Sequence, residues 1–136
     1  MSNCIFCSIV EGRTTAFIIY QDKNLLAIMD RYPSAQGHVL ILPKRHVTDI
    51  YGLNAKEAAE ILPLAQKISA KMKNVLGMSG LNLIQNNGKD AGQVIDHFHL
   101  HLVPRYENDG IVISNTKPIN TTPEELEHLA GLLYLQ

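Results

Sequence analysis

Short apolar runs separated by turn-forming residues dominate the first third of the chain. Residues 16–20 and 25–29 are apolar, and residues 21–24 between them are typical of a turn, so we expect a β-hairpin here. Residues 38–42 form a third apolar run, which predicts a third strand. Pro43 should end this strand or leave it at a sheet edge, because proline has no backbone N–H to donate.

Residues 54–76 carry the one long helical pattern. Asn54 can cap the helix, with Glu57 three residues later as in a capping box, and Gly77 is a good stop signal. Pro63 removes a backbone donor within this span and should kink the helix. The apolar side chains that recur on one face, and that we expect to pack in the core, are Ile61, Leu64, Ala65, Ile68, Met72 and Val75.

Two more strands are predicted in the second half. Residues 81–85 form one, and residues 97–103 alternate apolar and polar until Pro104 closes the run. The loop between them, residues 86–93, is rich in turn formers. A short helix is expected to begin after Thr122. Strands interrupted by one long helix favour an α+β fold with a mainly antiparallel sheet.

Composition narrows the class of protein. The chain has 136 residues, of which 46% are apolar and 18% charged, as in an ordinary globular domain. Lys plus Arg number 12 against 13 acidic residues, which argues against a strongly basic nucleic-acid binder. No apolar run approaches the length of a bilayer span, and no signal-peptide pattern is visible. Two cysteines cannot build a disulfide framework, so we expect a reducing, cytoplasmic location.

Three of the six histidines occupy alternate positions, His97, His99 and His101. On a strand, side chains two residues apart point the same way, about 6.7 Å apart along the chain. All three should therefore share one face, while the apolar residues between them fill the other. Such a strand is a rigid platform for chemistry.

The alternating histidines admit three interpretations. They can be an exposed strand that carries histidines without a shared role. A pair of them can hold a catalytic zinc ion, as two ligands on one strand can. A neutral imidazole can also attack phosphorus directly, with its neighbours fixing the tautomer and donating protons.

The segment His-φ-His-φ-His-φ-φ, with every φ apolar, resembles the signature of the histidine triad family of nucleotide hydrolases and transferases. The resemblance covers residues 4–105. It includes Ile5-Phe6 near the start, Asp30 after the second strand, residues 37–44, and the loop 86–93 that precedes the triad.

The resemblance implies a role for each matching residue. His99 matches the histidine that attacks the α-phosphate and forms a covalent nucleotidyl intermediate, which water resolves. His101 matches the histidine that hydrogen-bonds the phosphate and helps to protonate the leaving group, and His38 closes the catalytic cluster. Asp30 matches the carboxylate that holds the ribose hydroxyls. Asn86 and Gln93 match residues facing the phosphate and leaving group, and Phe6 and Ile9 resemble apolar walls for a purine.

Cys4 and Cys7 form a lone C-x-x-C, which by itself fits a redox pair, half a zinc site or chance. Some bacterial-type histidine triad proteins, and the related galactose-1-phosphate uridylyltransferases, look similar. In them two N-terminal cysteines, an upstream histidine and the first triad histidine bind a structural zinc ion. The matching set here is Cys4, Cys7, His46 and His97. Four protein ligands leave no open position, so this zinc would be structural and no catalytic metal is required.

The resemblance implies one domain over residues 1–136, with a core at 4–105 and a tail at 106–136. We expect a five-stranded antiparallel sheet, one long helix and a shorter C-terminal helix, in a homodimer whose two sheets join. The partner molecules would be purine nucleotides, AMP or GMP derivatives, with no nucleic acid and no membrane.

The expected reaction is hydrolysis of a purine nucleoside monophosphate from its leaving group, with a nucleoside phosphoramidate as the first choice. A dinucleoside polyphosphate is the alternative substrate. Two positions depart from the family pattern: Val94 stands where many relatives have Ser or Thr, and Asp96 stands where an apolar residue often precedes the triad. Val94 also motivates another alternative, a nucleotide-binding sensor or partner module with little turnover.

Overall fold

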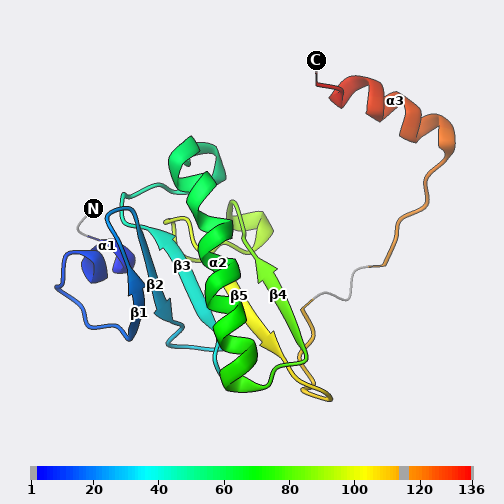
Figure 1. Cartoon of the computed structure of the whole chain (residues 1–136). Coiled ribbons are helices and arrows are strands. Elements are labelled where there is room, and N and C mark those ends of the chain that lie inside the picture. Colours follow the sequence, from blue (N-terminus) through cyan, green and yellow to red (C-terminus); the bar gives the residue numbers. More distant parts are fainter. Residues whose placement is uncertain (1–2, 114–116, 136) are drawn as a thin grey trace.

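A computed structural model describes residues 3–113 and 117–135, and its centre is a five-stranded antiparallel sheet in the order β1-β2-β3-β5-β4 (Figure 1). The expected α+β fold is confirmed. The elements are α1 (Ile5–Val10), β1 (Ile18–Gln21), β2 (Leu25–Met29), β3 (Val39–Pro43), η1 (Ile50–Gly52), α2 (Ala55–Leu76), β4 (Gly80–Ile84), η2 (Lys89–Ala91), β5 (Leu100–Arg105) and α3 (Pro123–Leu133).

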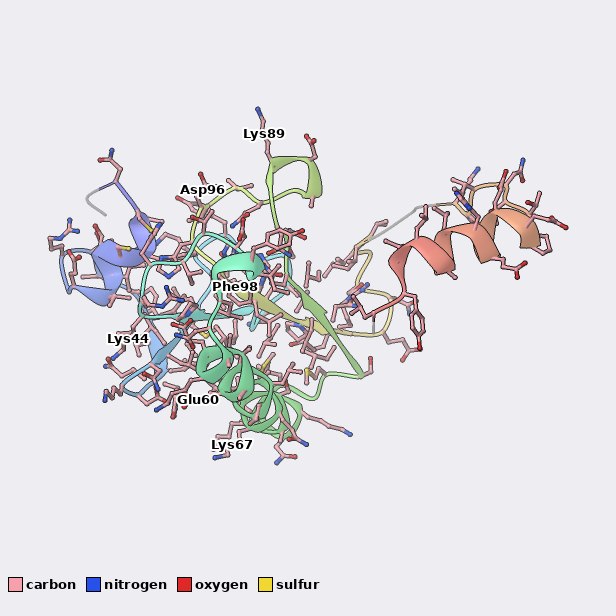
Figure 2. All side chains as sticks on the ribbon, turned by 90° about the horizontal axis from the view of Figure 1, so that it is seen from above. Lys44, Glu60, Lys67, Lys89, Asp96 and Phe98 are labelled. Carbon is pink, nitrogen blue, oxygen red and sulfur yellow. The ribbon has the colours of Figure 1, made fainter. Side chains whose placement is uncertain are left out.

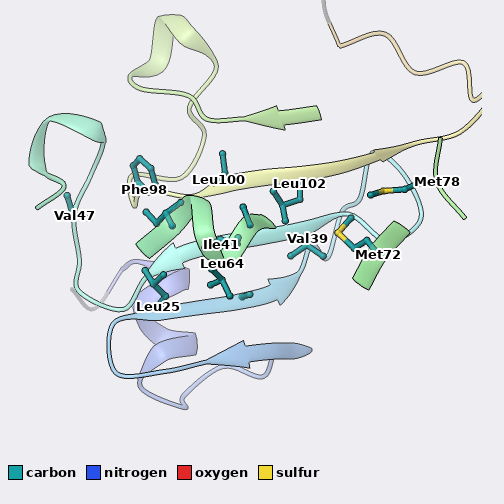
Figure 3. Packing of buried hydrophobic residues seen from close by; sticks show 13 residues of the cluster. Leu25, Val39, Ile41, Val47, Leu64, Met72, Met78, Phe98, Leu100 and Leu102 are labelled. Atoms are coloured by element: carbon teal, nitrogen blue, oxygen red, sulfur yellow. The ribbon is translucent and has the colours of Figure 1, made fainter. Parts of the chain in front are cut away.

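The sheet is buried on both faces in its centre. Figure 3 shows the packing of α2 against one face, where Leu64 of the helix meets Ile41, Leu100 and Leu102 of the strands. The opposite face carries a second, smaller cluster that includes Phe6 of α1. Alternation along β2, β3 and β5 supplies both clusters, because successive strand residues point to opposite faces. The strand face covered by α1 is the one that bears the histidines.

The long helix begins and ends as its sequence predicts. Asn54 accepts a hydrogen bond from the Glu57 N–H at 2.8 Å, and its own N–H donates to the Glu57 carboxylate at 3.1 Å, which completes a capping box. Gly77 ends the helix with φ +65°, and the helix continues through Pro63. The expectation for Val75 is wrong, since it is 67% exposed. The last turn packs through the next residue, Leu76, instead.

Two strand boundaries differ from those expected. β1 covers Ile18–Gln21 rather than residues 16–20, and β5 begins at Leu100 and runs through Pro104 to Arg105. Proline fits there because the Arg105 carbonyl accepts from Ser79 on the β4 side, which turns the Pro104 nitrogen to the other side of the strand. On that side the pairing with β3 has already ended at Leu102, so no ladder bond is lost.

The first and last helices differ in how they pack against the sheet. α1 was not expected from the sequence, and its Phe6 is buried against the sheet. α3 starts after Thr122 as predicted, but all its residues are exposed, and Figures 1 and 2 both show it standing away from the sheet. Across residues 3–113 and 117–135, no helix combines the length and apolarity needed to cross a bilayer.

Candidate active site and metal centre

The three alternating histidines lie on the face of the sheet that α1 covers. The ring of Phe6 packs edge-on against the rings of His97 and His99, with centroids 5.7 and 5.1 Å apart. The His99 and His101 rings are 4.9 Å apart. The intervening Phe98, Leu100 and Leu102 are buried on the α2 side. The predicted alternation of faces is present, but His97 and His99 precede β5, and only His101 of the three histidines lies on the strand itself.

One hydrogen bond fixes the tautomer of His99. Its Nδ1 lies 2.7 Å from the backbone carbonyl oxygen of His97. A carbonyl only accepts, so Nδ1 must carry the proton and donate it. The neutral ring then has its lone pair on Nε2. This nitrogen is the one available for nucleophilic attack.

A second chain of hydrogen bonds fixes His38 and His101. The Ser34 N–H donates to His38 Nδ1 at 3.0 Å, so in the neutral ring the proton sits on His38 Nε2. That nitrogen lies 2.9 Å from His101 Nδ1 and donates to it. The remaining proton of His101 is consequently on Nε2. His101 presents a hydrogen-bond donor beside the lone pair of His99.

Burial keeps this pair of histidines neutral. Desolvation, assisted by the neighbouring His99 and His38, lowers the pKa of His101 to about 4. Desolvation also lowers the pKa of His38, although the nearby charge of Asp30 opposes this shift. At neutral pH the tautomers derived above are therefore the populated ones.

Asp30 lies at the rim of the same cluster. Its Oδ2 is 3.4 Å from His38 Nε2 and 4.0 Å from His101 Nδ1, while its Oδ1 accepts from the Tyr32 N–H at 2.9 Å. The carboxylate thus both caps a turn and faces the cavity described next.

A cavity of about 490 Å³ opens beside the histidines. One wall comes from α1 and the segment after it, another from the ends of β2 and β3, and a third from the loop before the triad. Most of its lining side chains are apolar, and His99, His101, Asp30 and Asn86 are among the polar ones. The lining residues are Ile5, Phe6, Ile9, Thr14, Thr15, Ala16, Phe17, Ile28, Met29, Asp30, Arg31, Tyr32, Leu40, Asn86, Gly92, Val94, Ile95, His99 and His101.

Of the two candidate binding residues in the loop 86–93, one lines the cavity and the other is buried inside the protein. Asn86 lines the cavity, as does Val94, which is 90% exposed. Gln93 is not among the lining residues and is only 7% exposed. Its amide accepts from the Gly88 N–H at 2.8 Å and donates to two backbone carbonyls, Thr48 at 2.6 Å and Ile95 at 3.0 Å. All of these bonds are within the protein, and they hold the loop in place.

The four expected metal ligands come together beside the histidine cluster, on the same face of the sheet, with two of them in α1 or at its N-cap. The potential ligand atoms of Cys4, Cys7, His46 and His97 all lie within 4.8 Å of one another. The Cys4 Sγ–His97 Nδ1, Cys7 Sγ–His46 Nδ1 and Cys7 Sγ–His97 Nδ1 distances are 3.4, 3.2 and 3.7 Å. In a tetrahedral zinc site, sulfur and nitrogen ligands are about 3.6 Å apart, given the usual bond lengths. The geometry of the four side chains fits a zinc ion.

The protonation of this cluster also fits a metal. His97 Nε2 lies 2.8 Å from the Pro43 carbonyl and must donate to it, which leaves the Nδ1 lone pair facing the cysteines. Burial lowers the pKa of His97, so the ring is neutral as a ligand requires. Burial and the adjacent Cys4 raise the pKa of Cys7. A dication would reverse that effect by holding both sulfurs as thiolates.

A second group of ligand-type residues is less suited to a metal. Asp30, His38 and His101 also place three such atoms within 4.8 Å. However, the Ser34 N–H occupies the lone pair of His38 Nδ1, so Nε2 carries a proton and has no lone pair to offer. Loading this site would require breaking that bond. The tautomer of His38 thus favours a proton relay over a catalytic metal.

Several groups that shape the site could not be found from sequence. The Ser34 amide and the carbonyls of Pro43 and His97 set three imidazole tautomers, yet they are backbone atoms with no residue-type signal. Arg31 and Tyr32 line the cavity only because the turn after Asp30 directs them there. Thr14 and Thr15 follow α1, which the sequence did not reveal.

Comparison with known proteins agrees with this geometry. The profile of the HIT domain family matches residues 11–108. A HIT family protein from Bacillus anthracis superposes with a TM-score of 0.89 at 40% identity, covering 96% of this chain and 94% of that one. A Zn-bound histidine triad family protein from Mycobacterium smegmatis gives a TM-score of 0.78 at 35% identity, covering 86% and 85% of the two chains. The adenosine 5'-monophosphoramidase of Schizosaccharomyces pombe is 35% identical over 129 residues, which are 93% of this chain and 92% of that protein.

The fold and site define an α+β protein with a histidine cluster on one sheet face and a neighbouring Cys2His2 cluster. The chain belongs to the HIT, or histidine triad, family.

Proposed function

We propose that the protein hydrolyses purine nucleoside phosphoramidates to the nucleoside monophosphate, with His99 as the nucleophile. Membership of the HIT family, with relatives named adenosine 5'-monophosphoramidase, supports a nucleotide hydrolase in general. The observation that carries the specific proposal is the protonation pattern of the cluster. His99 has a bare Nε2 and His101 a protonated one, and their adjacent rings both line a cavity whose walls are mostly apolar.

The reaction follows from this arrangement in two steps. The lone pair of His99 Nε2 attacks the α-phosphorus; a P–N bond to the enzyme forms as the P–N bond to the leaving group breaks, and the departing amine takes up a proton. The His101 Nε2–H donates to the phosphate, which stabilises charge on its oxygens while the amine takes its proton from solvent. Water then attacks the phosphorus and breaks its bond to His99 Nε2. The proton that this water loses returns to solvent, and the monophosphate leaves. Positive charge on the His99 ring is offset by the His97 carbonyl that accepts from Nδ1.

The rest of the cavity suits a purine nucleoside. Phe6 and Ile9 offer apolar surface for the base, and Asp30 offers a carboxylate oxygen for the ribose hydroxyls. Asn86 faces the position of the phosphate or leaving group. We assign Gln93 to holding the loop rather than to direct contact. His38 keeps His101 in its donor tautomer and is therefore a positioning residue.

We further propose that Cys4, Cys7, His46 and His97 bind one structural zinc ion. Zinc would tie α1 to the segment that precedes the catalytic strand, and with four protein ligands it takes no part in the reaction. Metal analysis of protein purified without chelator should give close to one zinc per chain. Freely titrating thiols and no zinc would overturn this assignment. The reduced cysteines accord with a cytoplasmic location, and a homodimer with joined sheets accords with the family.

The deciding experiment is product analysis by chromatography after incubation with an adenosine phosphoramidate and, separately, with a diadenosine polyphosphate. We expect AMP from the first, and none when His99→Ala replaces the wild type. AMP mainly from the second would move the protein to the polyphosphate hydrolases with the same nucleophile.

AMP from neither compound would favour a nucleotide-binding module, for which the exposed Val94 is the supporting observation. In that case wild type and His99→Ala should still bind AMP with similar affinity. Resistance of kcat to a strong chelator, measured at saturating substrate in protein that stays folded, would separate the proposed mechanism from a catalytic metal.

A further inference from the structure

Helix α1 belongs to two sites at once. Its N-cap residue Cys4 and its third residue Cys7 are candidate metal ligands. Phe6 lies between them in sequence, and it lines the nucleotide cavity together with Ile5 and Ile9 of the same helix. One short segment of chain therefore supplies half of the metal ligands and one wall of the cavity.

Phe6 is the physical link between these sites. Its side chain is 4% exposed, and its ring packs edge-on against a metal ligand, His97, and against the nucleophile, His99. On the sheet it contacts the apolar cluster that includes Leu26, Ile28 and Leu40. A shift of α1 would move this ring relative to both histidines.

The metal ligands are well placed to hold α1. A six-residue helix has little stability of its own, because nucleation is costly and few hydrogen bonds follow it. The Cys4 sulfur accepts from the Cys7 N–H at 3.4 Å and so caps the helix. With zinc bound, both cysteines would be tied to His46 and His97, which lie 39 or more residues away in sequence. Without it, the attachment of the helix is left to the burial of Phe6, Cys7 and Ser8 and to the packing of Ile9 and Val10.

We propose that zinc binding at the Cys4–Cys7–His46–His97 cluster and purine nucleotide binding in the cavity strengthen each other, with Phe6 as the positioning residue that couples them. This inference rests on the proposed function, because it takes a purine nucleotide as the cavity's ligand. Zinc fixes the wall on which the base packs, so the nucleotide does not have to order that wall when it binds.

Linkage makes the effect reciprocal and measurable. If zinc tightens nucleotide binding by a given factor, the nucleotide must tighten zinc binding by the same factor. We expect a factor of about 5 or more, within the usual range of coupling between sites. AMP is a suitable probe because it has no leaving group to be hydrolysed.

The first measurement is the Kd for AMP, by isothermal titration calorimetry, of zinc-loaded and metal-free wild-type protein. It is made at a temperature at which far-UV circular dichroism shows that the metal-free sheet remains folded. The second is the zinc affinity, by competition with a chromophoric chelator, with and without saturating AMP. Equal factors from the two measurements would support the coupling, and AMP affinity that is unchanged by zinc would overturn it.

The variant Cys4→Ser tests the same coupling without removal of zinc from the wild-type protein. Serine is a strong N-cap, so the helix start is kept while a thiolate ligand is lost. We expect this variant to keep its fold, bind zinc more weakly and bind AMP about 5-fold less tightly than zinc-loaded wild type. Wild-type AMP affinity together with weakened zinc binding would contradict the proposal.

A matched pair of cavity variants tests whether Phe6 is the residue that couples zinc binding to nucleotide binding. Phe6→Leu keeps an apolar side chain in the cluster but removes the ring, so the ratio of AMP affinities with and without zinc should fall toward one. Phe17 also lines the cavity but lies outside α1. Phe17→Leu should weaken AMP binding equally in both metal states and leave the ratio unchanged. Equal loss of the ratio in both variants would show that Phe6 is not the link. Failure of zinc-loaded wild type to bind AMP at all would instead overturn the proposed function.

Discussion

The Nδ1 atom of His99 lies 2.7 Å from the carbonyl oxygen of His97, so the residue two positions earlier in the chain sets which nitrogen of His99 is free. The same His97 directs its ring Nδ1 toward Cys4 and Cys7. The alternation of residues 97–101 thus does more than place three imidazoles on one face. It gives the first histidine a ligand role through its ring and an orienting role through its backbone.

A covalent nucleotide on His99 is the first prediction. Mixing enzyme with an adenosine phosphoramidate and quenching within the turnover time should trap one adenylyl group, bonded through phosphorus to Nε2. Tandem mass spectrometry, which fragments the peptide between its histidines, should locate the adduct on His99 rather than on His97 or His101 of the same peptide. The adduct should be absent from His99→Ala, because no other imidazole in the cluster combines a free lone pair with exposure to the cavity. Trapping of the adduct at His101 or His38 would reverse the assigned roles.

The low pKa of His101 predicts a loss of stability in mild acid. In the unfolded chain this histidine binds a proton near pH 6.5, whereas in the folded protein its pKa is about 4. The unfolded state therefore binds more protons between these two pH values, so stability is complete above about pH 6.5 and declines as the pH falls toward 4. From pH 7 to pH 5 this histidine alone should lower the free energy of unfolding by about 2 kcal/mol.

Urea unfolding of wild type and His101→Asn at pH 7 and pH 5 measures this contribution. Asparagine does not titrate in this range, so the variant should lose less stability than wild type between the two pH values. Acid release of a bound metal would affect both proteins and cancels in the difference. An equal loss in the two proteins would show that His101 titrates normally in the fold. A nuclear magnetic resonance titration of the His101 ring with a midpoint near 4 would give the same answer directly.

Replacing Val94 with a hydroxyl residue tests the leaving-group end of the cavity. Val94 is 90% exposed on the cavity rim, so Val94→Ser should change stability by less than about 0.5 kcal/mol. If a hydroxyl there reaches the leaving group, kcat/KM for the phosphoramidate should rise several-fold. Val94→Ala is the control for simple loss of bulk and should not show this rise. Equal rates for both variants would mean that this position does not contact the leaving group.

Sequence periodicity predicted the elements of this fold better than their ends. The capping box at Asn54 and the stop at Gly77 depend on local hydrogen bonds, and both were predicted to the residue. The start of β5 and the exposure of Val75 depend on which neighbouring residues pack there. The predictions made for both from the sequence were wrong. α1 is too short for an apolar period to show. It is stabilised by packing of Phe6 and by the cap from Cys4, neither of which has a strong local signal.

In the candidate site, the functional side chains could be predicted from the sequence, but their backbone hydrogen-bond partners could not. Every side chain proposed for the metal cluster and for the histidine cluster was named from sequence, because histidines and cysteines are rare and their spacing is informative. The hydrogen bonds that give each imidazole its tautomer come from the Ser34 amide and from the Pro43 and His97 carbonyls, and only tertiary structure brings these together. The resemblance that matched Gln93 to a residue facing the phosphate could not show that its amide is bonded to the backbone of Gly88, Thr48 and Ile95.

Gln93 supplies the last prediction, which separates loop anchoring from substrate contact. Its Nε2 donates to the Thr48 and Ile95 carbonyls, while its Oε1 accepts from the Gly88 N–H. Gln93→Ala leaves these buried groups without partners and should lower the free energy of unfolding by about 1–3 kcal/mol. Gln93→Glu keeps an acceptor for Gly88 but turns a carboxylate oxygen toward two carbonyls. It should be at least as destabilising as the alanine variant, because one oxygen of a buried, charged carboxylate would then face two carbonyl oxygens.

The measurement is urea unfolding at pH 7 for both variants, beside AMP binding by calorimetry. An anchoring role predicts a clear loss of stability in both, with nucleotide affinity and rate falling because the loop that carries Asn86 is no longer held. A substrate-contact role predicts the opposite pattern: stability within about 0.5 kcal/mol of wild type and a loss confined to turnover. Because the amide makes three hydrogen bonds to the protein while buried, we expect the first pattern.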